Sequence, residues 1–206
     1  MNYTEQEIAI IEQAKNNGGD IWNDQILNPI KRRVKLHYRA INFEQCCYCR
    51  RDLQDEFNMV IDIEHILPKG NTLFSEYMFD IENLNISCKR CNMNIKNDRI
   101  DFIVDLSKIK PNYKVSGKYH FIHPNLDNYF DHIDYESTIR NNKKLIKYNS
   151  KSEKGKYTYS YFHLDRIEID TLSKVQGVEI KTNELNPDLP EDIKANLEQL
   201  LDKLQK

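Results

Sequence analysis

Two pairs of cysteines constrain the fold of this chain more than any other feature. Both pairs have CxxC spacing: Cys46 with Cys49, and Cys88 with Cys91. Two such turns are a typical ligand set for one tetrahedral zinc, provided that the turns meet in space. Zinc would then join two distant parts of the chain, and its binding free energy would contribute to folding. The fifth cysteine, Cys47, is interpreted as a small thiol, buried or partly exposed.

Length and composition indicate one domain, or one compact module with extensions. The chain has 206 residues, of which 39% are hydrophobic and 30% charged, and its mean hydropathy is -0.73. No apolar run reaches the roughly 18 residues of a membrane span, and the acidic start resembles no signal peptide. We therefore expect a cytoplasmic protein without a membrane segment. In that compartment CxxC pairs indicate metal ligands more often than disulfides or four buried free thiols.

Charge is unevenly distributed along the chain. The formal net charge is only -2, whereas many nucleic-acid-binding proteins are strongly basic. Residues 31–51 and 140–156 are nevertheless locally basic, each with a single glutamate among many lysines and arginines. Such stretches can hold nucleic acid on a nearly neutral protein, and the low total charge indicates that a partner helps.

Helix signals precede the first cysteine pair. Thr4 and Glu7 have capping-box spacing, and the first helix is expected to stop at Gly18. A second helix is predicted from Asn28, followed by Pro29 at its first position. Its apolar stripe is Ile30, Val34, Tyr38 and Ile41. Its cations are either a solvated face or a phosphate-contacting one, and they are Lys31, Arg32, Lys35 and Arg39.

Short strands are predicted on both sides of an aromatic-containing loop. They cover residues 59–64 and 84–87, and a helix over roughly 91–99 follows the second cysteine pair. Beyond residue 100 the pattern is weaker: a turn-rich segment near 121–129 and an alternating strand over 156–162. A last helix opens at 188 with a leucine stripe, which is either core packing or a docking face.

The dipeptide Glu64-His65 between the cysteine pairs suits hydrolysis of a phosphodiester bond. A neutral imidazole can take a proton from water near neutral pH. Glu64 is a candidate ligand for a hard divalent ion such as Mg²⁺, and Asn92 offers a further oxygen ligand. Asn83 is expected to fix the loop between the strands through side-chain hydrogen bonds to the backbone.

These motifs together resemble the HNH endonuclease family, the zinc-bearing branch of the ββα-metal nucleases. The similarity covers roughly residues 45–98. It implies that His65 is the general base, Glu64 the acidic metal ligand and Asn83 the middle asparagine of the motif. Asn92 matches the last metal-binding position. The family usually has a lysine four residues after the final cysteine, where this chain has Ile95 followed by Lys96. A helix starting one residue later would make Asn94 the rival of Asn92.

A second similarity extends outside this core. The helix before Cys46, the run after Glu64 and the segment His123–Asp127 resemble the PtuB-like HNH subunits of Septu and retron-associated anti-phage systems. That resemblance implies an ATPase partner, which would explain a chain without a large DNA footprint of its own. His123 is more simply interpreted as a turn histidine with backbone partners.

We thus predict an α+β protein with a ββα-metal core stapled by a four-cysteine zinc site and helical extensions at both ends. The regions are 1–44 (helical), 45–99 (nuclease core) and 100–206 (an α/β extension for partner docking). The predicted activity is metal-dependent cleavage of DNA. The alternatives are a cleavage-inactive, zinc-stabilised adaptor that binds nucleic acid, and an RNA endonuclease acting on tRNA. The predicted nucleic-acid contacts are Lys31, Arg32, Lys35, Arg39, Lys89, Arg90 and Lys96.

Overall fold

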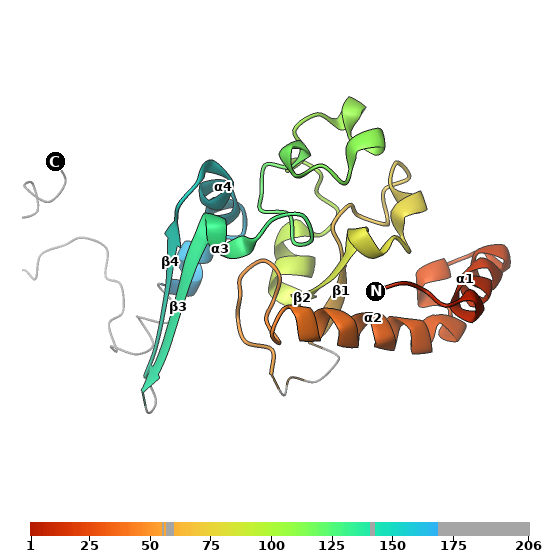
Figure 1. Cartoon of the computed structure of the whole chain (residues 1–206), viewed down its shortest axis with the longest axis horizontal. Helices are drawn as coiled ribbons and strands as arrows, with labels where there is room; N and C mark the ends of the chain where they lie inside the picture. Colours follow the sequence, from red (N-terminus) through yellow and green to blue (C-terminus); the bar gives the residue numbers. More distant parts are fainter. Residues whose placement is uncertain (55, 57–59, 141–142, 169–206) are drawn as a thin grey trace, which may run out of the picture.

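The computed structural model describes residues 1–54, 56, 60–140 and 143–168. This part of the chain is a mixed α and β structure built on two small antiparallel sheets of two strands each (Figure 1). Among the described helices, none has both the length and the apolar character needed to cross a membrane. The helix predicted from residue 188 lies outside the described residues.

Two N-terminal helices form one side of the molecule. α1 (Glu5–Asn17) begins with the predicted capping box, because Thr4 and Glu7 exchange side-chain and backbone hydrogen bonds. It ends at Gly18, whose φ of 70° suits glycine. α2 (Asn28–Ile41) buries the first three residues of the predicted stripe, but Ile41 is 51% exposed because the helix ends there.

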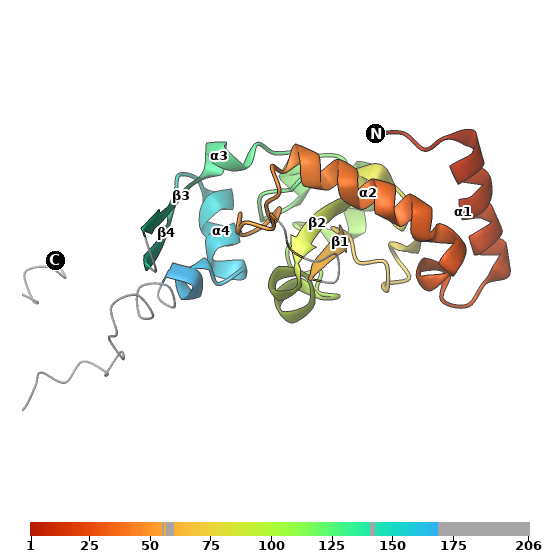
Figure 2. The ribbon, with the colours of Figure 1, turned by 90° about the horizontal axis from the view of Figure 1, so that it is seen from below.

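The first sheet pairs β1 (Ile61–His65) with β2 (Leu84–Cys88), and α2 lies across it (Figure 2). β2 runs almost directly into a π-helical turn, η5 (Arg90–Lys96), in place of the expected α-helix. The order strand, loop, strand, helical turn therefore agrees with the sequence prediction, with boundaries shifted by up to three residues. Among the described residues β1 pairs with β2 alone, and residues of β1 line a cleft.

The C-terminal half of the described chain contains a second sheet that the sequence analysis missed. β3 (Ile133–Arg140) and β4 (Lys143–Ser150) form a long hairpin, bounded by α3 (Tyr129–His132) and α4 (Glu153–Tyr161). The strand predicted over 156–162 was wrong. Ser152 caps a helix there by accepting from the Gly155 amide, and Gly155, Thr158 and Tyr161 are buried at helical spacing.

Two buried asparagines, Asn42 and Asn85, and the half-buried Asn125 tie these parts together. Asn42 at the end of α2 donates to Asn85 Oδ1 at 2.7 Å, and Asn85 donates to Asn125 Oδ1 at 2.7 Å. Asn125 in turn donates to the carbonyls of Glu82 and Leu84, both at 2.8 Å. The turn-rich segment predicted near 121–129 is therefore anchored to β2 by side-chain amides, which satisfy one another within the core.

Candidate functional site

Four cysteines form a buried cluster between the two halves of the molecule. The Sγ atoms of Cys46, Cys49, Cys88 and Cys91 all lie within 4.8 Å of one another. Tetrahedral zinc with Zn–S bonds of about 2.3 Å requires Sγ–Sγ separations of about 3.8 Å, and Cys49 and Cys88 are 3.8 Å apart. The donor set thus fits a structural metal such as zinc.

Hydrogen-bond donors surround this cluster. The Cys88 amide donates to Cys46 Sγ at 3.3 Å, and Arg90 Nη1 lies 3.9 Å from Cys91 Sγ. Arg90 also donates to the His163 carbonyl at 2.8 Å. Its side chain therefore faces the cluster and the C-terminal half, whereas the sequence analysis expected it to face nucleic acid. Cys47 is buried outside the cluster, and burial raises the pKa of its thiol.

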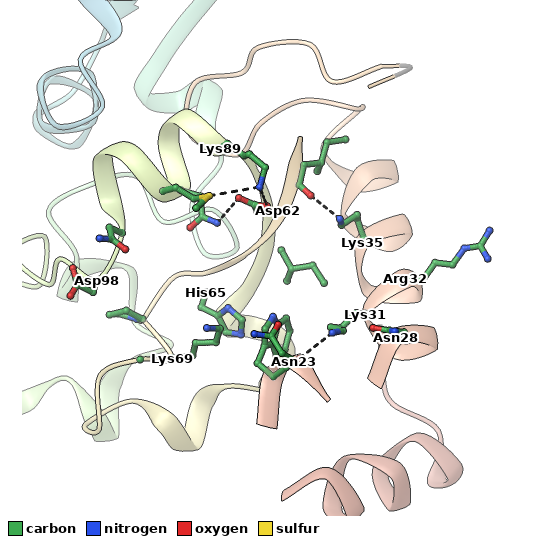
Figure 3. Close-up of a pocket in the computed structure, with 18 of the residues that line it drawn as sticks. Asn23, Asn28, Lys31, Arg32, Lys35, Asp62, His65, Lys69, Lys89 and Asp98 are labelled. Carbon is green, nitrogen blue, oxygen red and sulfur yellow. Dashed lines mark hydrogen bonds and ion pairs between the residues drawn. The ribbon is translucent and has the colours of Figure 1, made fainter. Parts of the chain in front are cut away.

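A cleft of about 910 Å³ runs between α2, β1 and η5 (Figure 3). Several predicted site residues line it: His65, Asn92, Lys31, Arg32, Lys35, Arg39 and Lys89. Apart from the four cysteines, four predicted site residues do not line it: Glu64, Asn83, Arg90 and Lys96. The structure therefore brings most of the predicted catalytic, magnesium-binding and nucleic-acid-binding residues to one cleft. The rest of this set lies around the cleft without lining it.

His65 stands at the end of β1 with its ring facing the cleft (Figure 3). Its Nε2 lies 3.1 Å from the Met78 carbonyl oxygen. A carbonyl only accepts, so Nε2 carries the proton in the neutral ring and Nδ1 is left as the acceptor. Burial, together with the charge of Lys69, lowers the pKa of His65 to about 3. The imidazole is thus neutral at physiological pH, with one nitrogen able to take a proton.

Asn83 holds the loop that carries these groups. Its Oδ1 accepts from the Leu67 amide at 2.7 Å, and its Nδ2 donates to the Leu67 and Tyr77 carbonyls, both at 3.1 Å. These bonds are the side-chain to backbone contacts that the sequence predicts. They fix both ends of the segment 67–77, next to the Met78 carbonyl that orients His65.

Glu64 points away from the cleft into the core, which differs from the position expected of a metal ligand. It is fully buried and pairs with Lys96, also buried, at 2.7 Å. Tyr48 Oη donates to it at 3.1 Å. Burial raises the pKa of the Glu64 carboxyl, and the ammonium of Lys96 opposes that shift. Lys96 also donates to the His65 carbonyl at 2.8 Å. A lysine 1% exposed cannot meet a phosphate, so its predicted nucleic-acid contact is wrong.

The cleft contains a different carboxylate, that of Asp62. Lys89 Nζ pairs with Asp62 Oδ1 at 2.9 Å, and Asn92 Nδ2 donates to Asp62 Oδ2 at 3.1 Å (Figure 3). Alternation along β1 puts Asp62 and Glu64 on the same face, which η5 covers. Asn92 lines the cleft, whereas Asn94 is exposed and lies outside it. The geometry therefore favours Asn92 over its rival.

The π-helical turn explains the displaced lysine. The Asn97 amide bonds the Asn92 carbonyl at 2.6 Å, five residues back, as in a π-helix. A wider turn accommodates one additional residue without changing the direction of those that follow. Lys96 thereby reaches Glu64 although it lies five residues after Cys91.

The cations of α2 are partly engaged with the protein. Lys31 Nζ donates to the Trp22 carbonyl at 3.0 Å, and Lys35 Nζ to the Ile61 carbonyl at 2.7 Å. Arg39 pairs with Glu44 at 2.5 Å, whereas Arg32 is exposed and extends outwards from the helix (Figure 3). All four of these cations line the cleft, and the solvated and phosphate-contacting interpretations of this face both stay predictions.

Trp22, Asp62, Lys69 and Asp98 are among the residues that line the cleft and that sequence reasoning missed. The sequence did contain a signal for Asp62, because it lies two residues before Glu64 on a predicted strand and therefore on the same face. Trp22 had none, because it is distant in sequence from every motif. Comparison with protein-family models, curated proteins and solved structures finds no match.

Proposed function

We propose that this chain is a metal-dependent endonuclease of the HNH type, with zinc in the cysteine cluster and DNA as substrate. The observation that carries the proposal is the position of His65, whose Nε2 lies 3.1 Å from the Met78 carbonyl oxygen, in a cleft lined by cations. A water beside Nδ1 would lose its proton to the ring as it attacks phosphorus. An ATPase partner stays a prediction.

The carboxylate best suited to hold Mg²⁺ is Asp62, with Asn92 beside it. Mg²⁺ commonly binds through one or two carboxylates plus substrate phosphates. Asp62 is in the cleft, whereas Glu64 is buried by Lys96. A bound ion would neutralise charge on the scissile phosphate and the leaving oxygen. Lys89 pairs with Asp62 at 2.9 Å and would share this carboxylate with the ion.

A cleavage-inactive adaptor that binds nucleic acid is the second candidate. The burial of Glu64 favours this candidate. So does the distribution of possible metal ligands: in the part of the chain that the structure describes, the cysteine cluster is the only group of three or more His, Cys, Asp or Glu side chains placed to hold a metal ion. An adaptor would need the zinc and the cations but no base.

Cleavage of plasmid DNA, with Mg²⁺ and with EDTA, separates the two. We expect His65→Ala to lower the rate by about 10²- to 10⁴-fold, the usual contribution of a general base, with zinc content and DNA binding retained. The matched control is His120→Ala, an exposed histidine outside the cleft, which should cut like the wild type. Asp62→Asn should raise the Mg²⁺ requirement, with partial recovery at high Mg²⁺.

The assay is run on the chain alone and in its natural complex, because a gated nuclease is silent without its partner. Wild-type cutting that His65→Ala retains in full would refute His65 as the base. DNA binding without any cutting in either setting would favour the adaptor.

A further inference from the structure

The cleft contains an aromatic ring that phosphodiester hydrolysis alone does not require. Trp22 lies in η1 (Ile21–Asn23), between α1 and α2. Its ring meets that of His65 edge to face, with centroids 4.3 Å apart, and Phe79 supports it at 5.7 Å. Trp22 lines the cleft and is only partly buried. A flat aromatic surface is thus held directly beside the candidate base.

A cation is fixed next to this ring. Lys31 Nζ donates to the Trp22 carbonyl at 3.0 Å and lies 5.8 Å from the ring centroid. Figure 3 shows Lys31 near the amide side chains of Asn23 and Asn28. An aromatic ring, a cation and two amides are the groups that recognise the base, the phosphate and the hydrogen-bonding edge of one nucleotide.

The size and charge of the cleft fit the same ligand. Its volume of about 910 Å³ is within the range of pockets that enclose a small ligand. Six cations line it against two carboxylates, Asp62 and Asp98, and Asp62 is paired with Lys89. A paired base inside a duplex keeps its faces stacked and cannot reach Trp22, whereas an unpaired base can.

We propose that the cleft binds an unpaired nucleotide, with its base against Trp22 and its phosphate near Lys31. This inference rests on the proposed function and names its substrate class: single-stranded or locally unpaired nucleic acid. Cleavage would then occur beside the nucleotide that Trp22 holds, since His65 touches the same ring.

Trp22 is the only tryptophan of the chain, so its emission reports on this cleft alone. The full chain, with zinc bound and without added Mg²⁺, is titrated with a single-stranded DNA oligonucleotide, with the same strand carrying abasic sites, and with its blunt duplex. We expect quenching and tight binding with the normal single strand, and weak quenching with the abasic strand and the duplex. Unchanged Trp22 emission on saturation with the single strand would overturn the proposal.

Anisotropy with labelled oligonucleotides then measures the contribution of the ring. Trp22→Leu should weaken single-strand binding by about 5- to 150-fold, the effect of losing one stacked base, and should barely change duplex binding. The control is Phe43→Leu, an aromatic residue 80% exposed at the end of α2 that does not line the cleft. Equal losses for single strand and duplex would overturn the proposal. Because cleavage requires added Mg²⁺, binding is judged independently: quenching without any cutting in Mg²⁺, by the chain alone and in its natural complex, leaves this inference standing and refutes the proposed nuclease.

Discussion

His65 illustrates how one residue's surroundings set its chemistry. The Met78 carbonyl accepts from Nε2, and the Trp22 ring packs edge to face against the imidazole, so His65 is only 7% exposed. Burial that keeps the imidazole neutral also penalises the imidazolium that forms when it accepts a proton. The base therefore gains strength only when a negative charge, such as a substrate phosphate, enters the cleft.

This predicts an unusual pH dependence of cleavage. Because kcat/KM reports ionisations of the free enzyme, and because the pKa of free His65 is lowered to about 3, kcat/KM should not fall between pH 8 and about 5. The acid limb of kcat should lie at higher pH than that of kcat/KM, since a bound phosphate stabilises the imidazolium. Initial rates at saturating Mg²⁺ measure both. An acid limb of kcat/KM near pH 6.5, the ordinary histidine value, would contradict this environment for His65.

At the scale of elements, the Glu64–Lys96 pair joins β1 to η5. Both side chains are essentially inaccessible to water, and Lys96 also bonds the His65 carbonyl. Breaking a buried pair from one side leaves an uncompensated charge, whereas replacing both partners by neutral groups costs much less. The pair therefore makes the position of the base depend on the helical turn that carries Cys91.

We expect Lys96→Met to lower the free energy of unfolding by about 3–5 kcal/mol, and the double variant Glu64→Gln/Lys96→Met to recover much of that loss. Lys89→Met is the matched control on the adjoining residue before η5, because its pair with Asp62 is partly exposed and should contribute about 1 kcal/mol or less. Urea unfolding with zinc present measures all three. Equal losses for Lys96→Met and Lys89→Met would contradict a structural role for the buried pair.

Sequence patterns predicted the local elements better than the direction of side chains. CxxC spacing and the Asn83 position are short-range signals, and the structure brings the four cysteines together and bonds Asn83 to its loop. Strand alternation alone could not say which face η5 would cover, so Glu64 was expected in the cleft. The three tyrosines of α4 alternate like a strand, but the Ser152 cap and the close approach of Gly155 to the His132 carbonyl favour a helix.

Considered over the whole molecule, basic residues separate into two groups. Those near the cleft come from α2, the loop at Lys69 and the start of η5. Those of residues 143–156 include lysines paired with nearby carboxylates, as in Lys154 with Asp127 at 2.6 Å and Lys151 with Asp134 at 2.7 Å. In the described part of the chain, six cations therefore line the cleft that also holds His65.

Arg32 and Lys147 test which group meets nucleic acid. Both are exposed, Arg32 at the cleft and Lys147 on β4 opposite Glu136. Arg32→Gln should reduce the slope of log affinity against log salt by about 1, because one fewer phosphate contact releases one fewer counterion. Lys147→Gln should leave the slope unchanged. A flatter slope for Lys147→Gln alone would move the binding surface to the hairpin.

Removing the metal should disrupt much more than the cysteine turns. Arg90 links the cluster to the His163 carbonyl, and Tyr148 Oη donates to the Cys49 carbonyl at 2.6 Å, so both halves of the described chain meet there. Without the ion, four buried thiols lose the interaction that holds these segments, and metal binding energy is folding energy in such sites.

We expect about one zinc per chain, and loss of cooperative unfolding after chelation or in Cys88→Ser. Cys47→Ser is the control, since Cys47 is buried outside the cluster. Elemental analysis, circular dichroism and Trp22 emission measure the outcome, and a freshly purified, folded protein without zinc would contradict it.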